Sequence, residues 1–114
     1  MERLTGLQDL KLSFNELNGP IPVQLGSLSK LTWLALQDNK LNGSIPSELG
    51  RMTGLQDLEL SENELNEPIP VELGSLSKLA FLELVYNKLT ESIPSELGRM
   101  TDLADLDLSM NKLT

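Results

Sequence analysis

A period of 24 residues runs through the chain and constrains its fold more than any other feature. When the sequence is aligned with itself at this shift, every leucine falls in one of six columns, and the four isoleucines form a seventh in which each is followed by proline. A fixed period of about 20–50 residues is typical of repeat architectures, in which a repeat buries its apolar face only against its neighbours. We therefore expect one stacked domain, residues 1–114, with repeats at about 7–30, 31–54, 55–78, 79–102 and, in part, 103–114.

A second period of 48 residues shows that a pair of repeats was duplicated. Residues 3–50 and 51–98 are identical at 36 of 48 positions. Six of the twelve differences place glutamate in the second copy, so that the formal charge is 0 for residues 3–50 and −6 for residues 51–98. The acidity of the chain is therefore local.

The composition excludes several kinds of chemistry. The 114 residues contain no histidine and no cysteine, which excludes Ser-His and Cys-His catalytic pairs, imidazole or thiolate metal sites and disulfides. A net charge of −8 opposes binding to nucleic acid and to anionic lipid. No secretion signal is visible, and no segment approaches the ~18 apolar residues of a membrane span. We expect no cofactor, no metal, no nucleic-acid partner and no membrane insertion.

Each repeat carries the same local pattern. In residues 7–12, Leu10 and Leu12 alternate with polar residues, which predicts a short, half-buried strand. In residues 45–50, we expect Pro46 at the first helical position, Glu48 in the first turn and Gly50 as a left-handed cap. This segment is long enough for a single helical turn, of which the 3₁₀ form is one option.

One column holds only asparagine. It follows the predicted strand of every repeat, at a turn, where a buried amide side chain can satisfy backbone N–H and C=O groups one repeat above another. We expect a structural role for these residues: Asn15, Asn39, Asn63, Asn87 and Asn111.

The complete repeat resembles that of a known family. Its first copy reads Leu7-x-x-Leu10-x-Leu12-x-x-Asn15-x-Leu17-x-Gly19-x-Ile21-Pro22-x-x-Leu25-Gly26-x-Leu28. This is similar to the 24-residue leucine-rich repeat of the plant type, as in the ectodomains of receptor-like kinases and in polygalacturonase inhibitors. The resemblance implies a right-handed α/β solenoid with a short-stranded parallel sheet on the concave face and 3₁₀ or short helical turns on the convex face. It also implies a non-catalytic recognition protein, extracellular or at the cell surface, that binds proteins, peptides or glycans.

The sequence departs from the family pattern in two respects. Glu67 and Glu91 replace the glycine that is kept at Gly19 and Gly43, which conflicts with any backbone geometry that needs a positive φ there. The cysteine-paired caps of extracellular members are absent. Because the terminal repeats lack a polar outer face, we expect that the chain is a fragment of a longer array or that it associates end to end through exposed leucines.

The candidate binding surface lies on the strand face that points away from the leucine core. Every aromatic residue falls there, with Phe14 and Trp33 on adjacent rungs and Phe81 and Tyr86 on one rung. An uncovered parallel sheet with exposed aromatic residues is typical of a contact surface, and the carboxylates between them favour a partner with basic groups. The candidate contact residues are Asp9, Lys11, Phe14, Trp33, Asp38, Asp57, Glu59, Glu62, Phe81, Glu83, Tyr86, Asp105 and Asp107.

Other interpretations remain open. β propensity alone accounts for aromatic residues on a strand, and acidic side chains also keep an array soluble, as in a structural scaffold without a ligand. Paired carboxylates such as Asp57 and Glu59, or Asp105 and Asp107, resemble those of glycosidases, but an open concavity does not raise a carboxyl pKa as general acid catalysis requires. We therefore expect no enzyme.

Two binding functions of a different kind are also conceivable. Calcium between the acidic columns would have oxygen ligands, although no loop has the spacing of a dedicated site. A lattice such as ice would need an unbroken column of small polar groups, and Glu67 and Glu91 interrupt the candidate column of Asn18, Asn42, Asn66, Thr90 and Thr114. The triplet Asn42-Gly43-Ser44 fits an N-glycosylation acceptor, but the recurring Asn and Ser columns explain it equally well.

Overall fold

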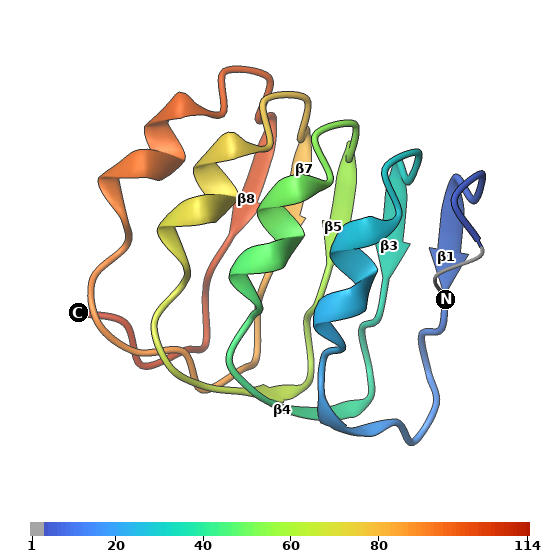
Figure 1. Cartoon of the computed structure of the whole chain (residues 1–114). Coiled ribbons are helices and arrows are strands. Elements are labelled where there is room, and N and C mark those ends of the chain that lie inside the picture. The colour runs from blue at the N-terminus through green and yellow to red at the C-terminus, as the bar shows by residue number, and fades with distance from the viewer. Residues whose placement is uncertain (1–3) are drawn as a thin grey trace.

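A computed structural model, which describes residues 4–114, shows a curved solenoid whose repeats stack side by side (Figure 1). Arg3, the first residue of the internal duplication, lies outside the described residues. The elements in chain order are β1 (Asp9–Lys11), β2 (Asn18–Pro20), η1 (Val23–Ser27), β3 (Trp33–Ala35), β4 (Lys40–Gly43), η2 (Ser47–Arg51), β5 (Asp57–Glu59), β6 (Glu64–Leu65), η3 (Val71–Ser75), β7 (Phe81–Glu83), η4 (Ser95–Arg99) and β8 (Asp105–Asp107).

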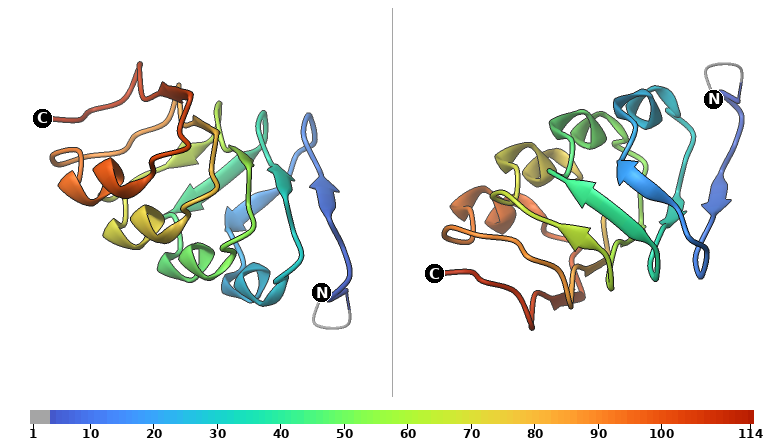
Figure 2. Two further views of the ribbon diagram at one scale, coloured as in Figure 1. Left: turned by 90° about the horizontal axis from the view of Figure 1, so that it is seen from above. Right: turned by 90° about the horizontal axis from the view of Figure 1, so that it is seen from below.

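The predicted strands form one parallel sheet in the order β1-β3-β5-β7-β8. Its register follows the 24-residue period, so that Leu34 pairs with Leu10 on one side and with Leu58 on the other. The four helices η1–η4, all of 3₁₀ type, lie on the opposite side of the solenoid and fan out more widely than the strands (Figure 2). This arrangement confirms the expected concave sheet and convex helical turns.

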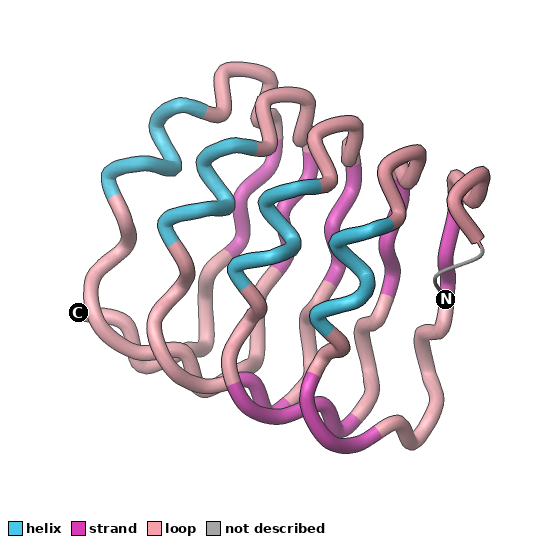
Figure 3. Tube along the Cα trace, in the orientation of Figure 1, coloured by secondary structure: helices cyan, strands magenta, loops and turns pink. Residues whose placement is uncertain are grey.

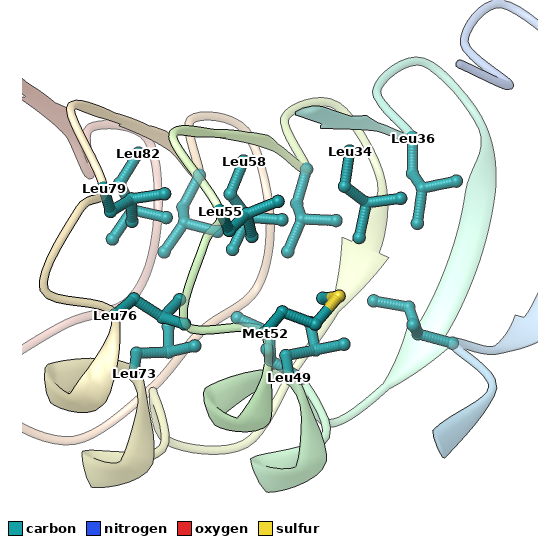
Figure 4. Close-up of a cluster of buried hydrophobic side chains, with 14 of the residues drawn as sticks. Leu34, Leu36, Leu49, Met52, Leu55, Leu58, Leu73, Leu76, Leu79 and Leu82 are labelled. Carbon is teal, nitrogen blue, oxygen red and sulfur yellow. The ribbon is translucent and has the colours of Figure 1, made fainter. Parts of the chain in front are cut away.

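The core fills the space between the sheet and the helices. Leu34, Leu58 and Leu82 point inward from the strands, and Leu49 and Leu73 meet them from the helices (Figure 4). All five side chains are completely buried. Each repeat supplies one layer of leucines, and because a layer is sealed only by its neighbours, the same column is less buried in the first and last repeats. Leu58 has no exposed surface, whereas its equivalent Leu106 is 41% exposed.

The asparagine column joins consecutive repeats through the backbone. The Asn63 carbonyl oxygen accepts from the Leu41 N–H of the preceding repeat at 3.0 Å. Its amide nitrogen donates to the Leu36 carbonyl of that repeat and to the Leu60 carbonyl of its own, at 3.0 and 3.1 Å. Asn39 and Asn87 make the same kind of contacts one repeat earlier and one repeat later. The side chain thus pairs buried backbone groups that would otherwise lack partners.

A second sheet, which the sequence reasoning did not predict, lies along one edge of the repeats (Figure 3). It contains β2, β4 and β6, again parallel, and pairs Asn18 with Lys40 and Pro20 with Asn42. Its residue pairs are therefore offset by 22 positions and not by 24. Short strands that contain Gly and Pro lack the alternation by which strands are recognised, which explains why they were missed.

The expected helix ends are wrong in two details. Pro46 is the extended residue before η2, with φ −65° and ψ 136°, and not its first helical residue. Gly50 lies inside the helix and does not have a positive φ. It is required for packing, because a Cβ atom there would lie 2.5 Å from the backbone oxygen of Glu72 in the next repeat. The same 2.5 Å approach occurs between Gly26 and the oxygen of Glu48.

The left-handed geometry that Glu67 and Glu91 were expected to disrupt is in fact retained. Gly19 and Gly43 have φ values of 79° and 76°, and Glu67 and Glu91 have φ values of 67° and 65°. Both glutamates are exposed. A left-handed non-glycine residue costs roughly 1–2 kcal/mol, and both glutamates keep this conformation.

Candidate functional site

The concave face concentrates the charge of the molecule. It is formed by three positions of each of the five rungs: the first and third residue of the strand and the residue before the recurring Asn. Fourteen of these fifteen residues are polar, aromatic or Met110, and only Ala35 is buried. The fifteen include eight carboxylates and one lysine, a net charge of −7. The other 99 residues carry nine acidic and eight basic side chains, a net charge of −1. The acidity is thus a property of this face.

Register decides which candidate residues meet. Asp57 on β5 lies between Trp33 on β3 and Phe81 on β7, and Glu59 lies between Ala35 and Glu83. Adjacent strands are ~4.8 Å apart, so these side chains form a continuous patch at the centre of the sheet. Asp9 and Lys11 lie on the first strand, and Asp105 and Asp107 lie on the last.

Trp33 is held by contacts within the chain and is only partly exposed. Its indole Nε1–H donates to Glu59 Oε2 at 2.9 Å. The Lys11 ammonium lies over the ring, 3.8 Å from its centroid, in a cation–π contact. The alternation along the strands predicts that these residues share one surface, but it does not predict the contacts, because they depend on which strands are neighbours.

Phe14, Tyr86 and Phe81 are the exposed aromatic residues of this face, with 75%, 52% and 45% of their surfaces exposed. Phe14 and Tyr86 have φ values of 57° and 58°. The equivalent residues Asp38, Glu62 and Met110 also have positive φ. At this position the chain turns out of the strand, and the side chain points away from the core. Because bulky residues rarely adopt a positive φ, this exposure is maintained at a cost to stability.

Three carboxyl groups on this face have raised pKa values, through burial, hydrogen bonding and the charges of neighbouring carboxylates. Burial, followed by the charges of Glu59 and Glu83, raises the pKa of Asp57 from 3.8 to about 6. Burial and the charge of Glu59 likewise raise the pKa of Glu83. A hydrogen bond with Asp38, and then the charge of that residue, raises the pKa of Glu62.

Asp107 behaves differently from its neighbours on the sheet. Its Oδ1 accepts hydrogen bonds from the Ser109 hydroxyl and from the Ser109 backbone N–H. These bonds favour the charged form and lower the pKa of Asp107. The carboxylates whose charged form is disfavoured, Asp57 and Glu83, therefore lie on β5 and β7. Asp107, whose charged form is stabilised by hydrogen bonds, lies on β8.

Asp57→Asn should stabilise the fold at neutral pH. Burial and the charges of Glu59 and Glu83 raise the pKa of Asp57 to about 6 in the folded chain, from the ordinary value of 3.8 that applies to the unfolded chain. The folded state therefore binds more protons between these values, and stability falls as pH rises through them. Asparagine removes this loss. We expect a gain of about 1 kcal/mol at pH 7.5, less than the pKa difference alone would give because the carboxyl is partly exposed, and little gain at pH 4.

Urea denaturation at the two pH values measures this effect. Asp102→Asn, the same change at an exposed loop residue, serves as the control and should alter stability little at either pH. An equal effect of both variants, or a gain that persists at pH 4, would contradict the assignment.

The remaining sequence-predicted sites lie away from the concave face. Asn42, in the candidate glycosylation triplet, is exposed on β4, and its modification stays a prediction. The column proposed for a lattice is staggered, because Asn42 pairs with Pro20 and Glu64 and not with Asn18 and Asn66. Within residues 4–114, no group of three or more acidic side chains has a geometry that could hold a metal ion.

Both ends of the stack expose apolar surface. At the first repeat, Leu4, Leu12 and Leu17 are exposed, and an apolar hollow of about 210 Å³ is lined by Leu10, Pro22 and other residues of the first two repeats. At the last complete repeat, Ile93 is 51% exposed, whereas its equivalents are buried. These ends fit the expectation of end-to-end contacts, which stays a prediction. In the described part of the chain, no helix is long and apolar enough to cross a bilayer.

Comparison with known families gives four matches along the chain. The family model described as Leucine Rich Repeat matches residues 6–28, 30–52, 54–76 and 78–100. No curated protein sequence matches the chain.

Similar solved structures include plant receptor ectodomains. One is the ectodomain of the Arabidopsis thaliana membrane receptor kinase GASSHO1/SCHENGEN3 in complex with CASPARIAN STRIP INTEGRITY FACTOR 2, with 46% identity and a TM-score of 0.97 over 98% of this chain and 13% of that one. The plant peptide hormone receptor RGFR1 in complex with RGF2 has 39% identity and a TM-score of 0.97 over 99% of this chain and 18% of that one. The chain thus spans less than a fifth of either receptor structure.

A third similar structure has a different activity. It is a plant ice-binding protein with 35% identity and a TM-score of 0.93 over 98% of this chain and 36% of that one. The same backbone therefore supports more than one kind of recognition.

Proposed function

Because the chain belongs to the leucine-rich repeat family, we propose that it is a non-catalytic recognition module that binds a protein or peptide with basic groups on its concave face. The observation that carries this proposal is the asymmetry of charge: the concave face has a net charge of −7 and the remainder of the molecule a net charge of −1. Electrostatic complementarity of this kind steers encounter and selects partners.

The exposed aromatic residues supply apolar contact area for binding, which charge alone does not provide. Aromatic side chains are enriched among the residues that dominate binding energy at interfaces. Phe81 and Tyr86 lie on one repeat, and both are about half exposed. We assign them the role of principal anchors, and we assign Trp33 a smaller direct role because Lys11 and Glu59 already occupy it.

The similar structures support a peptide or protein as the partner. The two plant receptor structures described above were solved in complex with CASPARIAN STRIP INTEGRITY FACTOR 2 and with RGF2, and the second is the structure of a peptide hormone receptor. We propose by this likeness that the chain functions outside the cell or at its surface, as part of a longer receptor-like or secreted protein. The staggered Asn/Thr column with Glu67 and Glu91 beside it makes an ice-binding role the weaker alternative.

Peptides selected from a random displayed library on the immobilised protein test the proposal. We expect the selected sequences to be rich in Arg and Lys. We also expect Phe81→Ala with Tyr86→Ala to weaken their binding at least 10-fold, which corresponds to about 1.4 kcal/mol or more, and affinity to fall as ionic strength rises.

The matched control changes Val23→Ala and Val71→Ala, which are equally exposed on the convex helices η1 and η3. This pair should alter affinity less than twofold. Peptides without basic residues, or peptides that bind the aromatic double variant as well as the unchanged chain, would refute the proposal.

A further inference from the structure

The two halves of the internal duplication place opposite charges beside equivalent aromatic residues. The shift of 48 residues carries Lys11 onto Glu59 and Trp33 onto Phe81. In the first half, the Lys11 ammonium covers the Trp33 ring at 3.8 Å. In the second half, the position of that lysine holds a carboxylate. The chain therefore provides its own cation at the first aromatic residue and an anion at the second.

Five carboxylates are neighbours of Phe81 in the sheet. In the register of the sheet, Asp57 and Asp105 flank it on the neighbouring strands, and Glu83 follows two residues later on its own strand. Strand geometry places the two diagonal neighbours at roughly 8 Å between Cα atoms. The five carboxylates that these three strands place in the same row as Phe81 or two residues further on are Asp57, Glu59, Glu83, Asp105 and Asp107.

This arrangement is unfavourable without a cation. Like charges on adjacent strands repel one another, and the pKa values of Asp57 and Glu83 are raised in part by their acidic neighbours. Asp57 Oδ1 is buried and has no hydrogen-bond partner among the described residues. Because carboxylate charge is shared by both oxygens, a cation at the exposed side of Asp57 would offset the cost of burying the other.

The Phe81 ring remains available to such a cation. It is 45% exposed, and within residues 4–114 the single cation–π contact of the structure is at Trp33. The contact at Trp33 shows directly that this sheet geometry seats a cation on an aromatic side chain while a carboxylate, Glu59, lies beside the same ring.

We propose that Phe81 and its five carboxylates form a subsite for one basic side chain of the bound peptide, and that arginine is the preferred occupant. A guanidinium group is planar, stacks on aromatic faces and donates up to five hydrogen bonds to carboxylates. It is also more weakly hydrated than an ammonium group, so less hydration is lost on binding. The subsite deepens the proposed function, since it lies on the proposed contact face, but it can be tested without the natural partner.

Titration with capped single amino acids tests the subsite directly. The probes are N-acetyl-arginine amide, its lysine equivalent and the neutral isostere N-acetyl-citrulline amide, followed by amide chemical shifts of the ¹⁵N-labelled chain. We expect saturable shifts centred on Phe81 and Glu83 with arginine, at least threefold weaker binding with lysine and no saturation with citrulline. Shifts spread evenly over all acidic residues, or equal responses to arginine and citrulline, would overturn the proposal.

The most specific variant introduces at position 59 the lysine that the first copy of the duplication has at position 11. Glu59→Lys should place an ammonium beside Phe81, as Lys11 is placed beside Trp33, and should weaken arginine binding at least 10-fold. Glu72→Lys makes the same change of charge on the convex helix η3 and should weaken it less than twofold. Equal losses in the two variants would show an effect of net charge alone and would overturn the subsite.

A second variant tests the subsite without changing the hydrogen bond of Trp33. Glu59 accepts the indole N–H bond of Trp33, so Glu83→Gln, which leaves that bond intact, is compared with Glu64→Gln on β6. We expect a loss of at least threefold for the first and of less than twofold for the second. The subsite fails if Glu83→Gln has no effect. The proposed function fails separately, if selected peptides ignore the changes at Phe81 and Tyr86.

Discussion

Replacement of Asn63 by leucine should lower the free energy of unfolding by about 4 kcal/mol. The side chain is 8% exposed and bonds the backbone groups of Leu41, Leu36 and Leu60. Leucine is similar in size but provides no polar atoms, so three buried backbone groups lose their partners. Each such loss costs about 1–3 kcal/mol. Urea denaturation followed by the fluorescence of the single tryptophan measures the change.

Asn15→Leu is the matched control. Asn15 occupies the same column, but it is exposed and bonds only the carbonyls of Leu12 and Ser13 in its own repeat. The control should cost less than about 1 kcal/mol, because water can replace both partners. Amide exchange at Leu41 should also accelerate in Asn63→Leu alone. Similar losses of stability in the two variants would show that the asparagines do not join the repeats.

Leu58→Ala should cost about 3 kcal/mol, the second largest effect that we expect. The side chain has no exposed surface and lies in the middle layer of the core (Figure 4), where large-to-small changes cost about 2–5 kcal/mol. Leu106→Ala removes the same atoms from the same column on β8, where the side chain is 41% exposed. Its cost should remain below about 1 kcal/mol. Denaturation midpoints compare the two, and equal costs would contradict a stack that is sealed only by neighbouring repeats.

Most of the fold could be predicted because the same sequence pattern occurs in four complete repeats and in part of a fifth. The alternation of Leu10 and Leu12 with polar residues predicted strands that the structure places at β1, β3, β5, β7 and β8. The asparagine column lies at the turns after these strands, where its amide groups bond two repeats at once. These features depend on local residue preferences and on contacts between equivalent positions of consecutive repeats. Both can be recognised in a sequence that has a fixed period.

The features that were missed depend on close approach in three dimensions. The sequence predicts Gly50 as a helix cap. In the structure its role is to let two helices pack closely, because a Cβ atom at this position would lie 2.5 Å from a backbone oxygen of the next helix. Glu67 replaces a glycine of the repeat pattern and was expected to disrupt the left-handed backbone there, yet it adopts a φ of 67°. Sequence alone does not show how much local strain the neighbouring repeats can offset.

The candidate site was predictable as a surface but not as a set of contacts. Alternation along the strands placed the acidic and aromatic residues on one face, because side chains on a strand alternate between two sides. The contact of Lys11 with Trp33 requires side-chain conformations. The group of carboxylates on the positions next to Phe81 became apparent only from the register of β5, β7 and β8.

The position of a bound peptide on the solenoid distinguishes the concave face from the convex helices and from the ends of the stack. A peptide selected on the protein would carry a nitroxide at one end, and its paramagnetic broadening of amide signals would be mapped on the ¹⁵N-labelled chain. If the peptide lies on the concave face, broadening will be strongest along β3, β5 and β7 and weak at the helices η1–η4. Broadening centred on those helices, or on the exposed leucines at the ends of the stack, would contradict it.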